Sequence, residues 1–403
     1  MKPTAVILAG GMSTRFSPFL TNKTMWPLCG RTALQHTLDM VQDAGVERVV
    51  VIANKINSEY LRTYQSVTPN LVVRLQSEAL GMDDALKSVA DVISKSPILV
   101  LNAIDFIDEN LIKRVLARVE TDHPPLLVCG MKTSSYVPAI GYYVLEQDRV
   151  RGVVEKPDEG KQPSDVIRHV FDYFENPSEF IALFDEFTAP HEKDARYELA
   201  QDVLLKKYGA PIEYSSYWAK LKYPHSVLDV MNILQKHVLR PHIDPTAHIS
   251  PHALIEGVVH IDKEARIEAG TIIKGPAYIG KRVIIGNNVL VRQSFIEESA
   301  TLGFGSEIAR SYVGPDCQIH HSFVGDSVLE KAVNMSWGTV TANLRLDRKN
   351  VSCKLPDGTR IPTGREKLGA LIAQGSFLGV NVSTMPGVCI VAGSNILPGS
   401  VVK

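Results

Sequence analysis

Residues 243–291 read IDPTAH ISPHAL IEGVVH IDKEAR IEAGTI IKGPAY IGKRVI IGNNVL V when they are written six at a time. Each group opens on isoleucine or valine, so nine apolar positions from Ile243 to Val291 keep one six-residue phase. Small, glycine and turn residues fill many of the positions between them. A hexapeptide repeat stacks apolar side chains along one inner edge of a parallel β-helix, where each coil covers the next. Strands of a sandwich alternate with period two and would not keep this phase.

The repeat continues beyond residue 291, with one long interruption. After a slip of one residue it resumes at Ile296, Leu302 and Ile308, and a final set occupies Ile372, Leu378, Thr384, Ile390 and Ile396. Residues from about 330 to 369 break the pattern and contain the polar turn sequence LPDG at 355–358. We expect this stretch to be a loop that leaves the coils, and loops of such length in a compact domain are usually functional.

The first 235 residues show a different pattern, in which short apolar runs alternate with amphipathic stretches such as residues 34–44. The runs lie at residues 5–8, 49–52, 71–73, 98–101 and 126–128. Runs without polar residues, separated by helices, indicate strands buried on both faces of a mostly parallel sheet. The sequence therefore predicts a doubly wound α/β domain, which binds ligands at the carboxyl ends of its strands. We place the domains at residues 1–238 and 239–403.

Composition excludes several classes of protein. The 403 residues contain 43 Lys and Arg against 44 Asp and Glu, a formal net charge of −1, which argues against a general nucleic-acid binder. The five cysteines are scattered without a Cys-x-x-Cys pair, so we expect neither a disulfide framework nor a cysteine zinc site. No apolar run approaches the ~20 residues that span a bilayer, and the N-terminus does not resemble a signal peptide. We expect a soluble cytoplasmic protein with no membrane partner.

A glycine turn follows the first predicted strand. The chain reads LAGGMSTR over residues 8–15 and NKTMWP over residues 22–27. Glycines let the backbone approach a ligand closely, and successive N–H groups form a cradle for anions. Arg15 and Lys23 then add two cations eight residues apart. This combination suits phosphate groups, although a Gly-Gly turn by itself often only closes a strand.

The two strings together resemble the signature of the sugar-1-phosphate nucleotidyltransferases, Leu-Ala-Gly-Gly-x-x-x-Arg followed by Lys-x-Met-x-Pro. An α/β domain of this type followed by a β-helix further resembles the bifunctional N-acetylglucosamine-1-phosphate uridylyltransferase/glucosamine-1-phosphate acetyltransferases and their archaeal-like relatives. The resemblance implies a Rossmann-like nucleotidyltransferase domain and a left-handed parallel β-helix. It also implies that a sugar-1-phosphate attacks a nucleoside triphosphate with Mg²⁺ as cofactor, and that the β-helix assembles a homotrimer.

The resemblance also assigns residues of the first domain. Nucleotide binding falls to Leu8, Ala9, Gly10, Gly11, Gln76 and Gly81, and sugar-phosphate binding to Gly141, Glu155 and Lys156. Arg15 would hold the triphosphate, Lys23 the α-phosphate, and Asp105 the metal ion. The Gln76 amide can both donate to and accept from a base edge, which base discrimination requires. A carboxylate such as Asp105 at the end of a strand suits Mg²⁺ held against phosphates.

The β-helix resembles an acetyltransferase in the segment HHSFVGD at residues 320–326. The resemblance makes His320 the base that takes a proton from an amino sugar before the amine attacks acetyl-CoA, a task that suits a histidine pKa near neutrality. Asn334 and Asn343 match two asparagines of the family. Lys367 matches a lysine of its extended loop.

Departures from the family pattern leave three interpretations open. The expected proline before Lys23 is Asn22, the second metal-binding aspartate is replaced by Lys220, and the tyrosine of the acetyltransferase segment is Phe323. Bulky Trp337 also stands where the family has a small residue. The chain is therefore a bifunctional enzyme, a nucleotidyltransferase with a purely structural β-helix, or a non-catalytic homologue that senses a nucleotide sugar.

Overall fold

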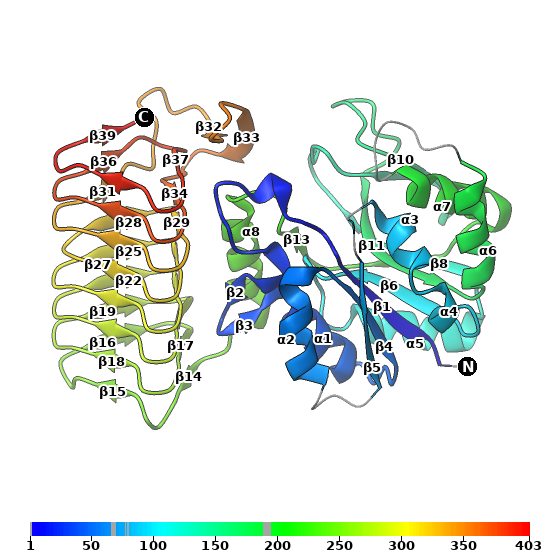
Figure 1. Ribbon diagram of the computed structural model, residues 1–403, viewed down its shortest axis with the longest axis horizontal. Coiled ribbons are helices and arrows are strands. Elements are labelled where there is room, and N and C mark those ends of the chain that lie inside the picture. Colours follow the sequence, from blue (N-terminus) through cyan, green and yellow to red (C-terminus); the bar gives the residue numbers. More distant parts are fainter. Residues whose placement is uncertain (1, 66–69, 77, 79, 188–194) are drawn as a thin grey trace. The chain divides into compact units, whose positions relative to one another are not determined.

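The five apolar runs of the first 235 residues lie in five strands of one nine-stranded sheet (Figure 1). Four of them, β1 (Thr4–Ala9), β4 (Val49–Ala53), β5 (Leu71–Leu75) and β6 (Ile98–Asn102), are parallel, in the order β6-β1-β4-β5. β11 (Val166–Phe174) runs antiparallel to β6 and continues the sheet toward its other edge. The sheet is therefore mixed, with four parallel strands around β1 and a further parallel pair, β8 (Leu126–Lys132) with β12 (Ile212–Tyr214), beyond β11.

Alternate residues of the parallel strands face opposite sides of this sheet. Val6, Val50 and Val100 belong to one apolar cluster, and Ile7 and Val51 belong to another. Residues of α1, α2 and α5 pack on the Ile7 side, and those of α3, α6 and α7 on the Val6 side. Burial on both faces explains why these strands lack polar residues.

The structure describes residues 2–65, 70–76, 78, 80–187 and 195–403. The other strands of the sheet are β8 (Leu126–Lys132), β9 (Tyr142–Glu146), β10 (Arg149–Val154) and β12 (Ile212–Tyr214). The α-helices are α1 (Ala33–Asp43), α2 (Lys55–Gln65), α3 (Met82–Lys87), α4 (Ala90–Ile93), α5 (Leu111–Asp122), α6 (Pro177–Ala182), α7 (Ala195–Tyr208) and α8 (Ser226–Ile233). Short strands β2 (Pro27–Leu28), β3 (Arg31–Thr32), β7 (Asp105–Ile107) and β13 (Trp218–Lys220) lie outside the large sheet.

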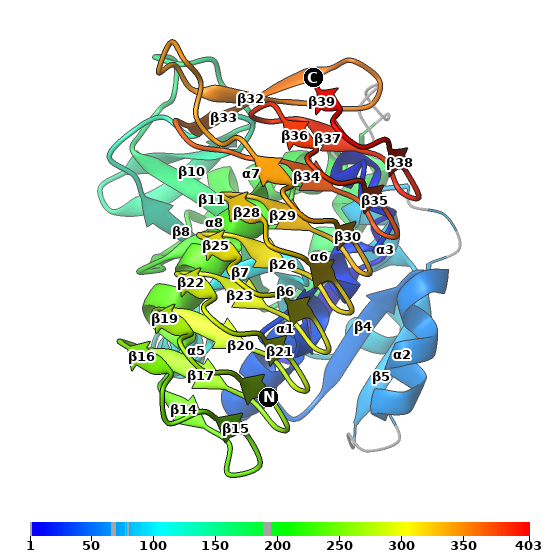
Figure 2. The same ribbon diagram turned by 90° about the vertical axis from the view of Figure 1, so that its left-hand side faces the viewer.

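The hexapeptide repeats form coils of a left-handed parallel β-helix (Figure 2). Three parallel sheets of eight strands make its faces, which we call the β14, β15 and β16 faces after their first strands. Ile243 pairs with Ile261, and Ile261 with Ile279, so residues eighteen apart lie above one another. The six-residue phase therefore places one apolar side chain on each face of each coil, and the predicted fold is confirmed.

These inward side chains form one continuous apolar core from Val259 to Ile390. The β14 face contains β14 (His242–Ile243), β17 (Val259–Ile261), β20 (Ala277–Ile279), β23 (Phe295–Ile296), β26 (Tyr312–Val313), β29 (Val328–Leu329), β34 (Leu371–Ile372) and β37 (Cys389–Ile390). The β15 face contains β15 (His248–Ile249), β18 (Arg266–Ile267), β21 (Ile284–Ile285), β24 (Thr301–Leu302), β27 (Gln318–Ile319), β30 (Asn334–Met335), β35 (Phe377–Leu378) and β38 (Asn395–Ile396). The β16 face contains β16 (Leu254–Glu256), β19 (Ile272–Lys274), β22 (Leu290–Arg292), β25 (Glu307–Ala309), β28 (Phe323–Gly325), β31 (Val340–Thr341), β36 (Ser383–Thr384) and β39 (Val401–Val402).

The excursion from the coils begins later than the sequence pattern predicts. β30 and β31 continue the coil in register through residue 341, where we expected a loop from about residue 330. The chain leaves after Thr341 and forms the hairpin β32 (Val351–Lys354) and β33 (Arg360–Arg365) before β34 resumes the coil. Polar residues such as Asn334 make an intact coil look like a loop in the sequence, because their side chains point away from the core of the coil.

Contacts divide the chain into two compact units, residues 1–12 with 34–218 and residues 13–33 with 219–403. The segment 13–33 contains the 3₁₀ turns η1 (Thr14–Phe16) and η2 (Lys23–Met25) as well as β2 and β3. No helix among the described residues combines the length and the apolar character needed to cross a membrane.

Candidate active sites

The glycine turn that we expect to bind phosphate follows β1, at the carboxyl end of the parallel strands. A Cβ atom at Gly10 would lie 2.2 Å from Gln76 Oε1, so glycine is needed for the Gln76 side chain to pack against the turn. Gln76 directly follows β5 and is 8% exposed. The structure therefore brings Gly10 and Gln76 together, while Leu8 and Ala9 end the buried strand that leads into the turn.

Two buried asparagines at the start of α2 hold this turn. Asn54 Nδ2 donates hydrogen bonds to the carbonyl oxygens of Ala9 (3.3 Å) and Gly11 (3.0 Å), and Asn57 Nδ2 donates to Ala9 O at 2.8 Å. The two asparagines also fix each other, because each backbone N–H donates to the other's Oδ1. Neither residue was predicted, although Asn54, directly after the buried β4 and before α2, carried an available signal.

Gln76 is oriented by the helix that follows it. Its Nε2 donates to Asp84 Oδ2 at 2.9 Å and reaches Gly81 O at 3.4 Å. Gly81 precedes α3 with φ of 133°, a conformation that favours glycine. Residues 77 and 79 of the predicted base-binding motif lie outside the described residues. The amide that we expect to contact the base is thus fixed by Asp84, a residue that the sequence analysis did not identify.

Asp105, the candidate magnesium ligand, begins β7 and is 7% exposed. The described residues contain no group of three or more His, Cys, Asp or Glu side chains that could hold a metal ion. Mg²⁺ in phosphoryl-transfer sites takes one or two carboxylates and receives its other ligands from phosphates and water. One carboxylate at this edge of the sheet fits such an ion, whose remaining ligands would come from the substrates.

Arg15 and Lys23 lie on the 13–33 segment, in η1 and η2. The Lys23 backbone N–H donates to Ser13 Oγ at 2.9 Å, which ties the start of the segment to the lysine. Asn22 Oδ1 accepts from Thr24 N (3.0 Å) and Thr24 Oγ1 (2.8 Å) and so caps η2. The predicted catalytic residues Arg15 and Lys23 therefore belong to the second compact unit, whereas the predicted nucleotide-binding residues belong to the first.

Two buried glutamates of the β-helix anchor the backbone of this segment. Glu330 Oε1 accepts from Leu20 N (3.1 Å) and Thr21 N (2.7 Å), and its other oxygen accepts from Gln374 N at 2.9 Å. Glu297 accepts from Cys29 N (2.8 Å) and Gly30 N (3.1 Å). Burial raises the pKa of Glu297 to about 7, although these two N–H groups favour its charged form.

Tyr312 adds an aromatic contact to this attachment. Its hydroxyl donates to Pro27 O at 2.8 Å, and its ring packs on Trp26 with a centroid distance of 5.4 Å. Trp26 also contacts Phe16 and Phe19, so an aromatic cluster fills the interior of the segment. The segment that carries both predicted catalytic cations therefore has a core shared with β26.

The predicted sugar-phosphate residues gather at one end of β9 and β10. A Cβ atom at Gly141 would lie 2.5 Å from Glu155 Oε1, which places these two residues in contact. Lys156 follows with φ of 47°, and its N–H donates to Ile140 O at 3.1 Å. Arg168 Nη1 lies 3.5 Å from Glu155 Oε1, and the Arg168 N–H donates to Gly141 O at 2.8 Å. Arg168, which the sequence analysis did not identify, therefore supports both Gly141 and Glu155.

Arg168 belongs to a buried charged cluster behind Glu155. It is 6% exposed, and its Nη1 lies 3.0 Å from Glu198 Oε1. Asp172 is fully buried and accepts from Tyr197 Oη at 2.7 Å. Burial raises the pKa of Asp172, and the charge of Arg168 and the Tyr197 hydroxyl only partly oppose this effect. The cluster fixes the arginine that faces Glu155.

Asn343 joins an ordered network at the corner between the β16 and β14 faces. Asn343 Nδ2 donates to Asp326 Oδ2 at 2.6 Å, and Arg310 holds both oxygens of Asp326 at 2.7 Å. Asp326 is 5% exposed. This bidentate ion pair fixes the aspartate of the HHSFVGD segment, so that Asn343 is positioned by Asp326 and Arg310.

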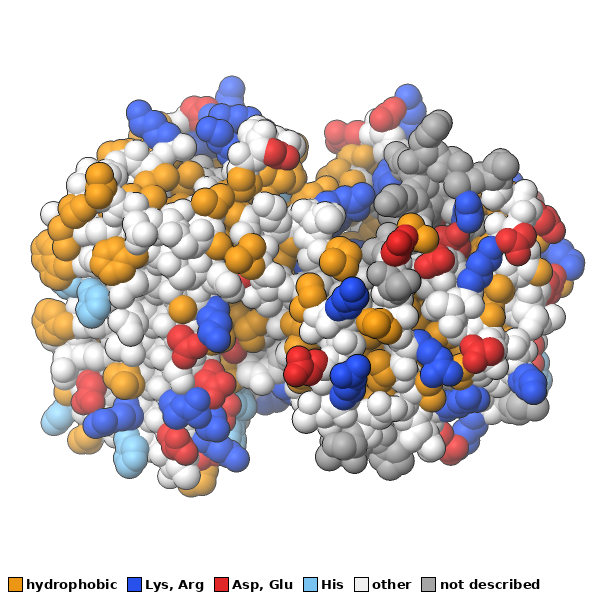
Figure 3. Space-filling model, in the orientation of Figure 1, with side chains coloured by type: hydrophobic (Ala, Val, Ile, Leu, Met, Phe, Trp, Pro, Cys, Tyr) orange, Lys and Arg blue, Asp and Glu red, His pale blue; other side chains and the backbone are white. Residues whose placement is uncertain are grey.

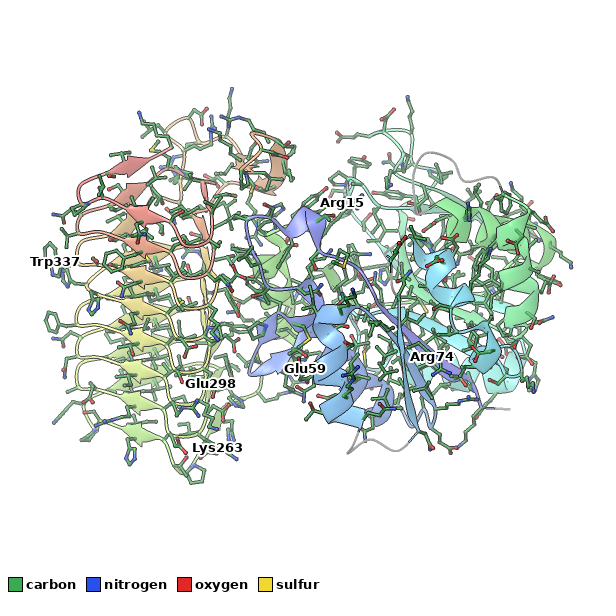
Figure 4. All side chains as sticks on the ribbon, in the orientation of Figure 1. Arg15, Glu59, Arg74, Lys263, Glu298 and Trp337 are labelled. Atoms are coloured by element: carbon green, nitrogen blue, oxygen red, sulfur yellow. The ribbon has the colours of Figure 1, made fainter. Side chains whose placement is uncertain are left out.

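His320 and His321 lie at a different corner, between the β15 and β16 faces. Both are exposed, and the His321 ring stacks between Phe304 and Trp337 with centroid distances of 6.2 and 5.1 Å. Trp337 projects outward from the coils (Figure 4) and is 57% exposed. Trp337, the bulky residue that departs from the family pattern, therefore stacks on His321, the neighbour of the predicted base.

The four predicted acetyltransferase residues are divided between these two corners of one chain. Asn334 lies on the β15 face, where its Nδ2 donates to Gln318 Oε1 at 3.3 Å, and His320 follows Gln318 by two residues. Lys367 is exposed and its backbone pairs with that of Leu344, next to Asn343. One chain thus groups His320 with Asn334, and Asn343 with Lys367.

Family models match both parts of the chain. Residues 5–181 match the MobA-like NTP transferase domain, and residues 255–361 match the GMPPB C-terminal domain. Two crystal structures, of apo-UDP-glucose pyrophosphorylase and of UDP-glucose pyrophosphorylase with UDP-glucose, share the N-terminal fold. The matched region is 59% of this chain and 99% of the pyrophosphorylase chain in each case. The TM-scores are 0.52 and 0.50, and the sequence identities are 14% and 16%, respectively.

Relatives cover almost the whole length. A bifunctional protein GlmU of Methanococcus maripaludis is 33% identical over 419 residues, which include 98% of this chain and 93% of that protein. A bifunctional sugar-1-phosphate nucleotidylyltransferase/acetyltransferase of Sulfurisphaera tokodaii is 28% identical over 99% of this chain and 97% of its own length. With both folds, the motifs and this coverage in agreement, the chain belongs to the GlmU family of bifunctional sugar-1-phosphate nucleotidyltransferase/acetyltransferase enzymes.

Proposed function

We propose that this enzyme transfers a nucleotidyl group from a nucleoside triphosphate to a sugar-1-phosphate and releases pyrophosphate. The observation that carries the proposal is the glycine turn after β1. Its carbonyl groups are held by Asn54 and Asn57, and Gln76 packs against Gly10. A turn fixed in this way offers a rigid backbone for phosphate binding and places a base-reading amide beside it.

The proposed reaction is an attack of a sugar-phosphate oxygen on the α-phosphorus of the triphosphate. Negative charge on the phosphoryl oxygens and on the departing pyrophosphate has to be stabilised, and most of the catalysis comes from positioning and charge. Arg15 would bind the triphosphate and Lys23 the α-phosphate. Asp105 would hold Mg²⁺, which when bound neutralises phosphate charge.

The sugar-1-phosphate would bind beside Gly141. Glu155 would accept hydrogen bonds from sugar hydroxyls, and Lys156 would pair with the phosphate. Arg168 is a positioning residue, because it reaches Glu155 from a buried cluster. Lys220 stands where the family has a second metal-binding aspartate, so we propose that Asp105 is the single protein carboxylate on the metal.

A substrate panel tests this function. Each of the common nucleoside triphosphates would be paired with glucose-, N-acetylglucosamine- and mannose-1-phosphate, and pyrophosphate release would be measured at high enzyme and Mg²⁺ concentrations. We expect release with at least one pair. If no pair releases pyrophosphate, the non-catalytic interpretation replaces the proposal.

We propose further that the β-helix acetylates an amino-sugar-1-phosphate with acetyl-CoA, with His320 as the base. The ordered Arg310–Asp326–Asn343 network supports an active site, since such a network holds the asparagine in one orientation. Phe323 and Trp337 favour the alternative of a structural β-helix. Free thiol released from acetyl-CoA with glucosamine-1-phosphate distinguishes the two, because a structural β-helix gives none.

The active form is proposed to be a homotrimer that assembles through the β-helix. His320 and Asn343 lie at different corners of one chain, so that corners of two copies would complete one acetyltransferase site. Exposed apolar side chains along the later coils support this assembly (Figure 3), among them Trp337, Val340, Phe377, Val380, Val391 and Leu397.

A further inference from the structure

Cys353 and Cys389 lie next to each other although 36 residues separate them in sequence. Cys353 belongs to β32 of the excursion hairpin and Cys389 to β37 of the coil, and their Sγ atoms are 3.3 Å apart. Both thiols are free in the structure. Neither the glycine turn nor the acetyltransferase network contains either residue.

The backbone holds the two sulfurs at this separation. Lys354, after Cys353, pairs with Val388, before Cys389, and Lys354 N–H donates to Gly387 O at 3.1 Å. The hairpin therefore continues the coil locally as an extra strand beside residues 387–389. A disulfide bond needs the sulfurs to approach to about 2.05 Å, a movement that side-chain rotation can supply when the backbones are already paired.

A buried histidine completes the cluster. His225, which precedes α8, is 6% exposed, and its Nδ1 is buried without a hydrogen-bond partner. The pKa of Cys353 is lowered, first by the hydrogen bond with the Cys389 thiol and then by His225. Cys353 is fully buried and Cys389 is partly exposed, so only Cys389 can meet a dissolved oxidant.

We propose that Cys353 and Cys389 are a redox-sensitive pair that a low-molecular-weight disulfide oxidises to an intrachain disulfide bond. The proposal goes beyond the two transferase activities and does not depend on either. The arrangement of one accessible thiol, one buried thiol and an adjacent imidazole is suited to thiol–disulfide exchange.

The exchange has two steps. The hydrogen bond with Cys353 and burial raise the pKa of Cys389, so Cys389 passes its proton to the Cys353 thiolate as it attacks one sulfur of the disulfide RSSR, which forms a mixed disulfide and releases one thiolate RS⁻. Cys353 then passes its proton to His225 and attacks the Cys389 sulfur, which expels the second RS⁻. The two leaving thiolates take up the protons lost by Cys389 and Cys353, so the dithiol and RSSR give the protein disulfide and two RSH.

The bond would fasten the excursion to the coil. The excursion begins beside Asn343 and ends beside Lys367. The backbones of Leu344 and Lys367 pair, so its two ends lie next to each other. A cross-link over 36 residues restricts the unfolded chain, and we expect oxidation to raise the Tm of the β-helix by about 5–10 °C.

The test uses the full chain, treated with oxidised glutathione or with dithiothreitol, then alkylated under denaturing conditions and digested for mass spectrometry. We expect a peptide pair joined through Cys353 and Cys389 and three alkylated cysteines in the oxidised sample, against five in the reduced one. Cys29→Ser, a matched control, should keep the disulfide, whereas Cys353→Ser and Cys389→Ser should abolish both the disulfide and the Tm rise.

His225→Asn separates the chemistry from simple proximity. We expect this variant to form the same disulfide roughly tenfold more slowly at pH 7, because the proton acceptor is missing. Five alkylated cysteines after oxidation of the wild type, with an unchanged Tm, would overturn the proposal. Cross-links that involve Cys29 or Cys317 instead would do the same.

Discussion

Lys23 shows how a single catalytic side chain can keep its place without the proline that precedes it in the family. Asn22 replaces that proline and caps η2 through Thr24, while Ser13 binds the Lys23 backbone. Three hydrogen bonds therefore restrain the turn that a proline ring would otherwise stiffen. The substitution by itself is no argument against catalysis.

We predict that Lys23→Ala lowers pyrophosphate release by about 100-fold or more, because it removes a positive charge from the transition state. Steady-state rates with the best substrate pair measure the effect. Lys263→Ala, at an exposed position of the β-helix, is the control and should leave the rate unchanged. Equal rates for wild type and Lys23→Ala would remove Lys23 from the mechanism.

Glu297 makes the stability of the second unit depend on pH. Burial raises its pKa from the ordinary value of 4.5 to about 7, and nearby Asp262 and Glu298 add to the effect. Between these two values the folded chain binds a proton that the unfolded chain has lost. Stability from this group is therefore full below about pH 4.5 and declines as pH rises through 7, by about 3 kcal/mol in total.

Glu297→Gln should flatten this decline, because a neutral amide does not titrate and one of its atoms still accepts a backbone hydrogen bond. Urea unfolding at pH 5, 6, 7 and 8 gives the free energy of unfolding for each variant. Glu264→Gln, at an exposed position of the same β-helix, should retain the slope of the wild type. A Glu297→Gln slope equal to that of wild type would show that Glu297 does not titrate in this range.

The sequence motifs predicted which residues form the site better than how they are held. Gly10, Gln76, Gly141 and Glu155 follow from short local strings, and the structure places them in two contacting pairs. Their supports, such as Asn57 and Arg168, come from other elements and make tertiary hydrogen bonds. A single sequence carries no period or spacing that marks such contacts.

At the scale of elements, the start of α2 acts as a brace for the turn after β1. Asn57→Ala would leave the buried Ala9 carbonyl with only the longer bond from Asn54. We expect it to cost about 1–3 kcal/mol of stability and to raise the KM for the nucleoside triphosphate more than it lowers kcat. Denaturant unfolding and initial rates measure the two effects.

Glu59→Ala, at an exposed position of the same helix, controls for a general loss of helix stability. It should change neither quantity measurably. Should Asn57→Ala keep the KM of wild type while losing stability, the brace would support the fold without shaping the nucleotide site.

The coil corner that carries His320 offers a second test between elements. His320→Ala should abolish thiol release from acetyl-CoA while pyrophosphate release continues at the wild-type rate, because the base serves only the β-helix reaction. His252→Ala, at another exposed coil position, should affect neither reaction. Loss of both activities in His320→Ala would instead indicate misfolding.

The six-residue repeat made the coils predictable wherever it stays in phase. Near residue 335, polar residues that point outward obscured the repeat, so the coil there was not predicted. The excursion hairpin could not be predicted, since β32 and β33 carry no hexapeptide phase and are stabilised by pairing with each other. Nothing in the sequence indicated that residues 13–33 belong to the same compact unit as the β-helix. This grouping depends on Glu330 and Glu297, more than 260 residues further along the chain.

At the scale of the whole molecule, we predict a trimer. Light scattering coupled to size-exclusion chromatography should give three times the chain mass of 44.4 kDa. Trp337→Arg together with Phe377→Arg would place charges among the exposed apolar side chains, and we expect them to dissociate the trimer. A wild-type mass equal to one chain would contradict the prediction, and the acetyltransferase residues of one chain would then have to act alone.

The carboxylates of Glu330 and Glu297 bind the 13–33 segment through backbone N–H groups, those of Leu20, Thr21, Cys29 and Gly30. The Leu20 and Thr21 side chains are therefore outside these hydrogen bonds, whereas a Cβ atom at Gly30, whose φ is 72°, would lie 2.7 Å from Tyr278 Oη. Substitutions of Leu20, whose side chain is 64% exposed, should therefore leave the segment attached, so this position is free to vary between relatives while the anchorage stays constant.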